Sequence, residues 1–323
     1  MRKPFTFTLK QTASPTPDRA LFLGALAVCL IAAFVAGACG DKTPKTSDAS
    51  AAEVKSATPP QPSPAASETP GTSTTTEPTV TGPVSFEDGQ TAFTEKRYDE
   101  ALRLFTTYTT EQPDNVWGYY MLGLSAWKAG DRDRAVEALT LALGKDSTHV
   151  KSHLNLSRVL LERGQAEQAL PHVEAALRID STSSEGFRLL GRVKDELGDA
   201  AGAIEQFKRA LALDPCDAWA MNNLAFIYIK QNRFEEALGP LARATEIDST
   251  VAQFHNNLGL ALERTGRVVQ AADAYRAALA IDSTYPKASV SLARVEAVQQ
   301  DSSVAPVDLG GLARSFVEQV KQP

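Results

Sequence analysis

The chain has 323 residues, of which 43% are hydrophobic and only 7% aromatic, and its formal net charge at pH 7 is −6. Basic residues outnumber acidic ones within the first forty positions, so the remainder of the chain is more acidic than this total. An acidic body is not attracted to phosphate groups, which disfavours nucleic acid as a partner. Three cysteines exclude a disulfide framework.

The N-terminal region begins with basic residues and continues into an apolar run. Residues 21–38 (LFLGALAVCLIAAFVAGA) carry no charge. This order is typical of a secretory signal peptide, in which a positive segment precedes an apolar one. A run of this length is also just long enough to span a bilayer, so an uncleaved membrane anchor over 1–38 is an alternative.

The apolar run ends in small side chains followed by a cysteine. Residues 35–40 (VAGACG) resemble the lipobox of bacterial lipoproteins, in which the cysteine is lipidated and becomes the mature N-terminus. The resemblance implies lipidation of Cys39, although Ala36 stands where the family usually has leucine. Because Ala36-Gly37-Ala38 also fits ordinary signal cleavage, free secretion is a third alternative. All three place the body of the protein outside the cytoplasm.

Residues 39–81 are predicted to be a disordered tether. The stretch 41–82 contains seven prolines and sixteen serines or threonines, with Val54 and Val80 as its only larger aliphatic residues. Such a segment buries too little apolar surface to offset its ordering entropy, and its prolines favour an extended chain. We expect a spacer that holds the body away from a membrane. The alternative is a disordered leader without this role.

From residue 82 the sequence repeats every 34 residues. One column of small residues recurs at this period, and an alanine follows twelve residues later in every unit. In five units a leucine precedes the small residue, whereas the first unit has Asp88 there. Large apolar residues follow the alanines, with the helical spacing of buried positions. The small-residue column consists of Gly89, Gly123, Ser157, Gly191, Ala225 and Gly259, and the alanine column of Ala101, Ala135, Ala169, Ala203, Ala237 and Ala271.

This period and these columns resemble the tetratricopeptide repeat (TPR), a helix–turn–helix unit of 34 residues. The resemblance implies an all-α fold, a right-handed TPR superhelix (α-solenoid) of six repeats plus a capping helix. Stacked units bury each other's apolar faces, so such an array needs a cap at its end. The six repeats are expected at 82–115, 116–149, 150–183, 184–217, 218–251 and 252–285.

Two further features concern the helix ends and the C-terminus. Where the family favours a late proline, four units have an Asp-Ser pair, and these residues also favour turns and helix N-caps. Residues 286–299 have the residue pattern of a seventh first helix and are predicted to cap the array. Residues 300–323 are expected to be a flexible tail, in which 312–321 has the apolar spacing of a short helix.

No sequence motif of an enzyme or cofactor site is present. The chain contains no P-loop, dinucleotide-binding, nucleophile-elbow or zinc-protease pattern, so we expect no catalytic activity, no cofactor and no metal. His149 and His153 have the four-residue spacing of metal ligands on a helix, but His149 falls in a turn between units. Packing and surface roles are therefore favoured for the histidines.

The TPR resemblance implies a concave groove lined by places 2, 5, 6, 9, 12 and 13 of each unit. In some TPR proteins, asparagines at the sixth place hold the backbone of an extended peptide, because a carboxamide both donates and accepts hydrogen bonds. The alternative is that the asparagines have no ligand. The asparagines concerned are Asn155, Asn223 and Asn257 at the sixth place and Asn222 and Asn256 at the fifth.

Large apolar side chains and two arginines also fall at groove places. All three tryptophans of the chain are among them, which favours anchoring of a partner over packing alone. Arg188 and Arg192 are placed to meet a carboxylate. Alternatively, the terminal segments or a second copy of the chain cover these residues. The apolar set is Trp117, Tyr120, Leu124 and Trp127 in the second unit and Trp219, Phe226 and Ile229 in the fifth.

Together these features predict a non-catalytic TPR scaffold, tethered to a membrane in the bacterial cell envelope. It is expected to bind a partner protein or extended peptide in its groove and to assist assembly of an envelope complex. The alternative function is a regulatory subunit of an envelope enzyme, such as a peptidoglycan-remodelling hydrolase. The alternative location is a single-pass membrane protein.

Overall fold

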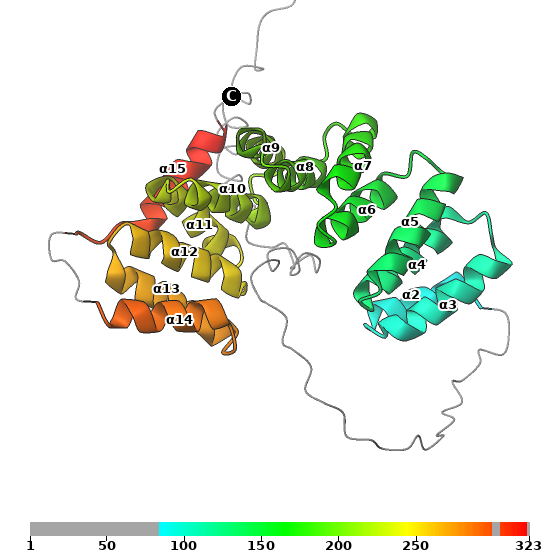
Figure 1. Ribbon diagram of the computed structural model, residues 1–323, viewed down its shortest axis with the longest axis horizontal. Helices are drawn as coiled ribbons and strands as arrows, with labels where there is room; N and C mark the ends of the chain where they lie inside the picture. Colours follow the sequence, from blue (N-terminus) through cyan, green and yellow to red (C-terminus); the bar gives the residue numbers. More distant parts are fainter. Residues whose placement is uncertain (1–83, 299–303, 322–323) are drawn as a thin grey trace, which may run out of the picture. The chain divides into compact units, whose positions relative to one another are not determined.

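A computed structural model describes residues 84–298 and 304–321 (Figure 1). These residues form fourteen α-helices and no strand, so the predicted all-α fold is confirmed. Helices α2 to α13 alternate as first and second members of antiparallel pairs, and α14 follows as a further first helix. The bounds are α2 Phe86–Thr94, α3 Tyr98–Glu111, α4 Val116–Lys128, α5 Arg132–Lys145, α6 Val150–Glu162, α7 Ala166–Ile179, α8 Ser184–Glu196, α9 Ala200–Leu213, α10 Ala218–Lys230, α11 Phe234–Ile247, α12 Ala252–Arg264, α13 Val268–Ile281, α14 Pro286–Glu296 and α15 Leu309–Lys321.

Within each pair, the small-residue column lets the two helices approach closely. A Cβ atom at Gly191 would lie 2.7 Å from the ring of Phe207 on the second helix of the pair, and one at Gly259 would lie 2.7 Å from the ring of Tyr275. Phe207 and Tyr275 are almost completely buried. The glycine therefore provides the space that the large side chain of the second helix fills.

The turns between pairs use a short motif that the sequence indicated only in part. Where an Asp-Ser pair replaces proline, a threonine follows, and the carboxylate accepts bonds from that threonine's backbone N–H and hydroxyl. At the first such turn, Asp146 Oδ1 lies 2.8 Å from the Thr148 nitrogen and 2.7 Å from its Oγ1. These bonds lower the pKa of Asp146. The same pair of bonds forms at Asp180–Thr182, Asp248–Thr250 and Asp282–Thr284.

The C-terminal helix α15 packs across second helices rather than extending the array. It contacts α11 and α9, and Phe316 and Ala313 are buried in this contact (Figure 1). Gly239 of α11 lies directly beneath, because a Cβ atom there would be 3.2 Å from the Phe316 Cβ. The segment that leads into α15 is held by Gln270 of α13. The Gln270 Nε2 donates to the Val307 carbonyl, and its Oε1 accepts from the Val307 N–H, both at 2.9 Å.

The predicted signal or anchor at 1–38, Cys39 and the tether at 39–81 lie outside the described residues. None of the helices that the structure does describe combines the length and the hydrophobicity needed to traverse a bilayer.

Candidate functional site

The first helices of the pairs share one surface of the array. Each of α2, α4, α6, α8, α10 and α12 contacts the next first helix along the chain, up to α14. No two of the second helices α3, α5, α7, α9, α11 and α13 contact each other within the described residues. The array therefore bends with the first helices on its inner side, and we call the surface that they form the inner face.

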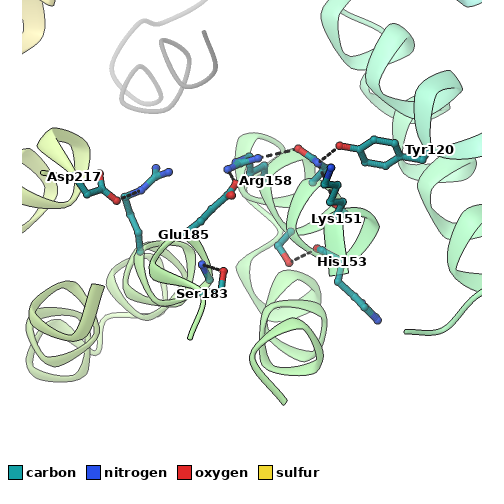
Figure 2. Close-up of polar contacts among 11 residues, drawn as sticks. Tyr120, Lys151, His153, Arg158, Ser183, Glu185 and Asp217 are labelled. Atoms are coloured by element: carbon teal, nitrogen blue, oxygen red, sulfur yellow. Dashed lines mark hydrogen bonds and ion pairs between the residues drawn. The ribbon is translucent and has the colours of Figure 1, made fainter. Parts of the chain in front are cut away.

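Asn155 on α6 is buried and bonded within the protein. Its Nδ2 donates to the Tyr120 hydroxyl at 3.2 Å and to the Lys151 carbonyl at 2.9 Å, while its Oδ1 accepts from Arg158 Nη1 at 2.8 Å. Figure 2 shows Tyr120 and Arg158 at the two ends of this contact. Burial raises the pKa of Tyr120. This amide joins α4 to α6 rather than standing open to a ligand.

The other asparagines form a short relay between α12 and α10. Asn256 Nδ2 donates to Asn257 Oδ1 at 3.3 Å, and Asn257 Nδ2 donates to Asn222 Oδ1 at 2.9 Å. These three residues are buried, whereas Asn223 is half-buried. The Nδ2 of Asn222 has no hydrogen-bond partner among the described residues. This amide donor at the end of the relay is enclosed by the surrounding side chains, and Asn222 is only 1% exposed.

The arginines of the inner face pair with carboxylates of neighbouring helices (Figure 2). Arg158 on α6 forms an ion pair with Glu185 on α8. Arg188 on α8 lies 2.9 Å from Asp217, which precedes α10, and both side chains are about nine-tenths buried, at 9% and 11% exposure. Arg192 is half-buried on the same helix as Arg188. A carboxylate ligand would have to compete with Glu185 and Asp217 for the two paired guanidinium groups.

The aromatic side chains of α4 differ sharply in exposure. Trp117 is 46% exposed, and its ring lies edge-on to Tyr120 at 5.5 Å and to His149 at 4.7 Å. Burial lowers the pKa of His149. Trp127 instead donates its Nε1–H to Glu162 at 3.0 Å, and Leu124 is half-buried.

On α10, Ile229 belongs to the core, Trp219 is half-buried against it, and Phe226 is exposed. The Trp219 ring packs against Phe254 at 4.9 Å, and Ile229 is buried. Phe226 is 41% exposed, with the Lys230 ammonium 5.7 Å from its ring. Of the apolar residues that the sequence placed in the groove, Trp117 and Phe226 are therefore the two that are exposed.

A pocket at the C-terminal end of the inner face was not predicted from the sequence. It has a volume of about 420 Å³ and lies between α12 and α14. A signal for it was present, because Lys287 and Val290 occupy the places in α14 that Trp117 and Tyr120 occupy in α4. The residues that line it are Asn256, Leu260, Tyr275, Pro286, Lys287, Val290 and Ser291.

The chemistry that these side chains offer is hydrogen bonding, charge pairing and apolar contact. No group of three or more His, Cys, Asp or Glu side chains within the described ranges is arranged to hold a metal ion. His153 and His255, both on first helices, bond the Ser147 and Ser249 carbonyls through Nε2 at 3.0 and 3.1 Å. His153 also lies 3.3 Å from His172, measured between the two Nδ1 atoms.

Two family models, both described as tetratricopeptide repeat, match the chain. One covers residues 196–258, and the other covers 120–184 and 248–286. No curated protein sequence matches the chain.

Solved structures with a similar fold include Cut9 with Hcn1 from the APC/C, at a TM-score of 0.59 and 22% identity, covering 64% of this chain and 41% of that one. A second is TTC0263, a thermophilic TPR protein of Thermus thermophilus, at a TM-score of 0.50 and 18% identity, covering 57% and 100% of the two chains. MamA of Desulfovibrio magneticus RS-1 has a TM-score of 0.46 and 23% identity, covering 50% and 92%.

Proposed function

We propose that this chain of tetratricopeptide repeats is a non-catalytic scaffold whose inner face binds a partner protein or extended peptide. The observation that carries the proposal is the exposure of Trp117 and Phe226, at 46% and 41%, on a face where most large side chains are packed. Exposed aromatic side chains are typical anchors of protein interfaces.

We further propose that the scaffold is held at a membrane of the bacterial cell envelope and assists assembly of a complex there. This part rests on the sequence alone, namely the apolar run at 21–38 and the lipobox-like segment ending at Cys39. A lipid on Cys39 would anchor the chain by burial of its acyl groups, at about 0.8 kcal/mol for each methylene. Residues 39–81 would then serve as the spacer.

The binding proposal is tested by removing the two exposed aromatic side chains together. The variant Trp117→Ala/Phe226→Ala should remain folded with a modest loss of thermal stability, because the two side chains are 46% and 41% exposed and neither is part of the buried core. Crosslinking in intact cells followed by quantitative mass spectrometry should show at least one partner recovered several-fold less than with the unchanged chain.

The matched control is Leu141→Ala/Leu213→Ala, which removes side chains that are 44% and 45% exposed on second helices. This control should leave partner recovery unchanged. Equal losses from both double variants, or no loss from either, would contradict a binding role of the inner face.

The tether is tested separately with labelled palmitate. Cys39→Ala should abolish incorporation of the label and release the protein from the membrane fraction. A label that persists in this variant, or that never enters the unchanged chain, would rule out lipidation at Cys39 and leave the anchor or secretion alternatives.

A further inference from the structure

The pocket between α12 and α14 has walls of almost purely apolar character. Leu260 of α12 and Val290 of α14 face it, and the Tyr275 ring from α13 contributes to its lining. Val290 is 66% exposed, the highest value among the exposed large hydrophobic residues of the described chain. An aliphatic side chain with two-thirds of its surface in water gains by being covered. The pocket volume of about 420 Å³ lies within the range of ligand sites, which is about 300–1,000 Å³.

A partly exposed polar contact holds the two helices that form this pocket. The Tyr275 hydroxyl donates to Glu263 at 2.8 Å, and the same carboxylate accepts from Nε and Nη2 of Arg294 at 2.7 and 2.8 Å. These bonds link α13, α12 and α14. Burial and the neighbouring Glu263 raise the pKa of Tyr275, so the hydroxyl keeps its proton. The pocket is therefore preformed, and its binding cost is correspondingly low.

The polar groups at the pocket indicate the charge and the conformation of the occupant. Lys287 belongs to the lining and makes no ion pair within the described residues, while Arg294 is neutralised by Glu263. The Asn256 Nδ2 is used by Asn257, but its Oδ1 receives no hydrogen bond from the described residues. A positive charge and a side-chain amide acceptor thus flank the apolar pocket.

We propose that this pocket binds an extended peptide segment of a partner protein, with an aliphatic side chain inside the pocket and an Asp or Glu next to it. The aliphatic group covers Leu260 and Val290, the carboxylate pairs with Lys287, and a backbone N–H donates to Asn256 Oδ1. An acidic segment is favoured because Lys287 is the unbalanced charge of the lining. This proposal rests on the proposed function, since it names which part of the inner face recognises a partner and by what chemistry.

The test is a phage-display selection in which a random peptide library is screened for binding to the purified full chain. The enriched sequences should contain an aliphatic residue adjacent to Asp or Glu. Fluorescence anisotropy with a labelled copy of an enriched peptide should show at least tenfold weaker binding to Val290→Asp. Lys287→Glu should weaken binding of the same peptide several-fold, and added salt should reduce the difference from the unchanged chain.

The control variant is Val269→Asp, which places the same change at a 56% exposed valine of α13 that does not line the pocket. It should bind like the unchanged chain. Val290→Ser serves as a milder second variant, and circular dichroism melting establishes that each variant is folded. Enriched peptides that are basic, or that form helices, would overturn the proposed chemistry of the occupant.

The outcomes also separate this inference from the broader proposal. Peptides that bind Val290→Asp and Val290→Ser normally but fail to bind Trp117→Ala/Phe226→Ala would overturn the pocket while supporting the inner face. Failure of any peptide to enrich on the folded full chain would count against both.

Discussion

The N-terminal and C-terminal parts of the array are built from the same repeat but are held together differently. From α2 to α8, each helix packs against the next helix along the chain and each first helix also contacts the next first helix. The apolar core of this part falls into two clusters, one over 84–138 and the other over 120–193. From α9 to α15, a single cluster runs from residue 203 to residue 316. Helix α15 adds Phe316 to this cluster, and it crosses α11 and α9 on the side opposite the inner face.

The contacts of α15 make this solenoid depart from a simple sum of neighbouring units. Stability in such arrays is approximated by each repeat plus its contacts with the next one. Helices α9 and α11 do not contact each other, so α15 adds a link between their two units beyond the one that α10 already makes. We therefore expect the C-terminal part to open as one unit and the N-terminal part to open hairpin by hairpin.

The largest effect is expected from removing the side chain that docks α15. Phe316→Ala deletes a buried ring over Gly239 and should lower the free energy of unfolding of the C-terminal part by about 3–5 kcal/mol, an amount limited by what α15 contributes. Hydrogen exchange should then rise in α9, α11 and α15 together. Protection of α2–α5 should not change.

Arg314→Ala is the matched control, because Arg314 is on the same helix and its side chain is 76% exposed. Its exchange pattern should equal that of the unchanged chain. If Phe316→Ala raised exchange only in α15 itself, α15 would be a passive addition and the two parts of the array would be equivalent.

The fold could be predicted from the sequence because the repeat columns act locally. Gly191 and Phe207 are sixteen positions apart, and the same pair of places is in contact in other units. The repeated spacing in the sequence therefore predicts the contact. The docking of α15 does not recur. Its helical spacing was visible in Leu312 and Phe316, but nothing periodic indicates that Gly239 is the surface on which it packs.

The candidate site was predicted less completely, for a related reason. The sequence placed Asn155 and Arg188 at groove positions, yet hydrogen bonding between helices depends on rotamers and on the neighbouring unit. Asn155 bonds to Tyr120 and Arg188 pairs with Asp217, each across one repeat. Burial of a polar side chain requires such partners, so place in a repeat does not by itself indicate access to a ligand.

An intermediate effect is expected from adding one methyl group to the same column in each part. In Gly123→Ala the new Cβ would lie 2.6 Å from Leu139 Cγ, and in Gly259→Ala it would lie 2.7 Å from the Tyr275 ring. Overpacking of this kind should cost about 1–3 kcal/mol in each variant. Faster hydrogen exchange should be confined to α4 and α5 in the first variant and should spread through α11–α15 in the second.

Gly144→Ala provides the control for the glycine substitutions. Position 144 lies in α5 and has open space around it, so the change should stabilise the helix by up to about 1 kcal/mol. Identical spreading of exchange in Gly123→Ala and Gly259→Ala would remove the proposed difference in cooperativity.

The smallest effect is expected from mild acid, and it should fall on the N-terminal part. Burial lowers the pKa of His149 and of His172, and the charge of the nearby His153 lowers the pKa of His172 further. The unfolded chain takes up these protons near pH 6.5, whereas the folded chain does so only at lower pH. The folded state therefore binds fewer protons, and stability is lost as the pH falls through the interval between the two pKa values.

Tryptophan fluorescence can assign this acid effect to one part of the array. A Trp219→Phe variant reports through Trp117 and Trp127, and a Trp117→Phe/Trp127→Phe variant reports through Trp219. Between pH 7 and pH 5, the urea midpoint of the first variant should fall and that of the second should fall less. Carboxylates such as Asp146, whose pKa is lowered in the folded chain, contribute only at more acidic pH.

His172→Gln should reduce the fall in the urea midpoint seen by the N-terminal reporters, because it removes one of the two groups that must become charged. If both reporters shifted together, the array would unfold as one unit and the distinction between its two parts would not hold.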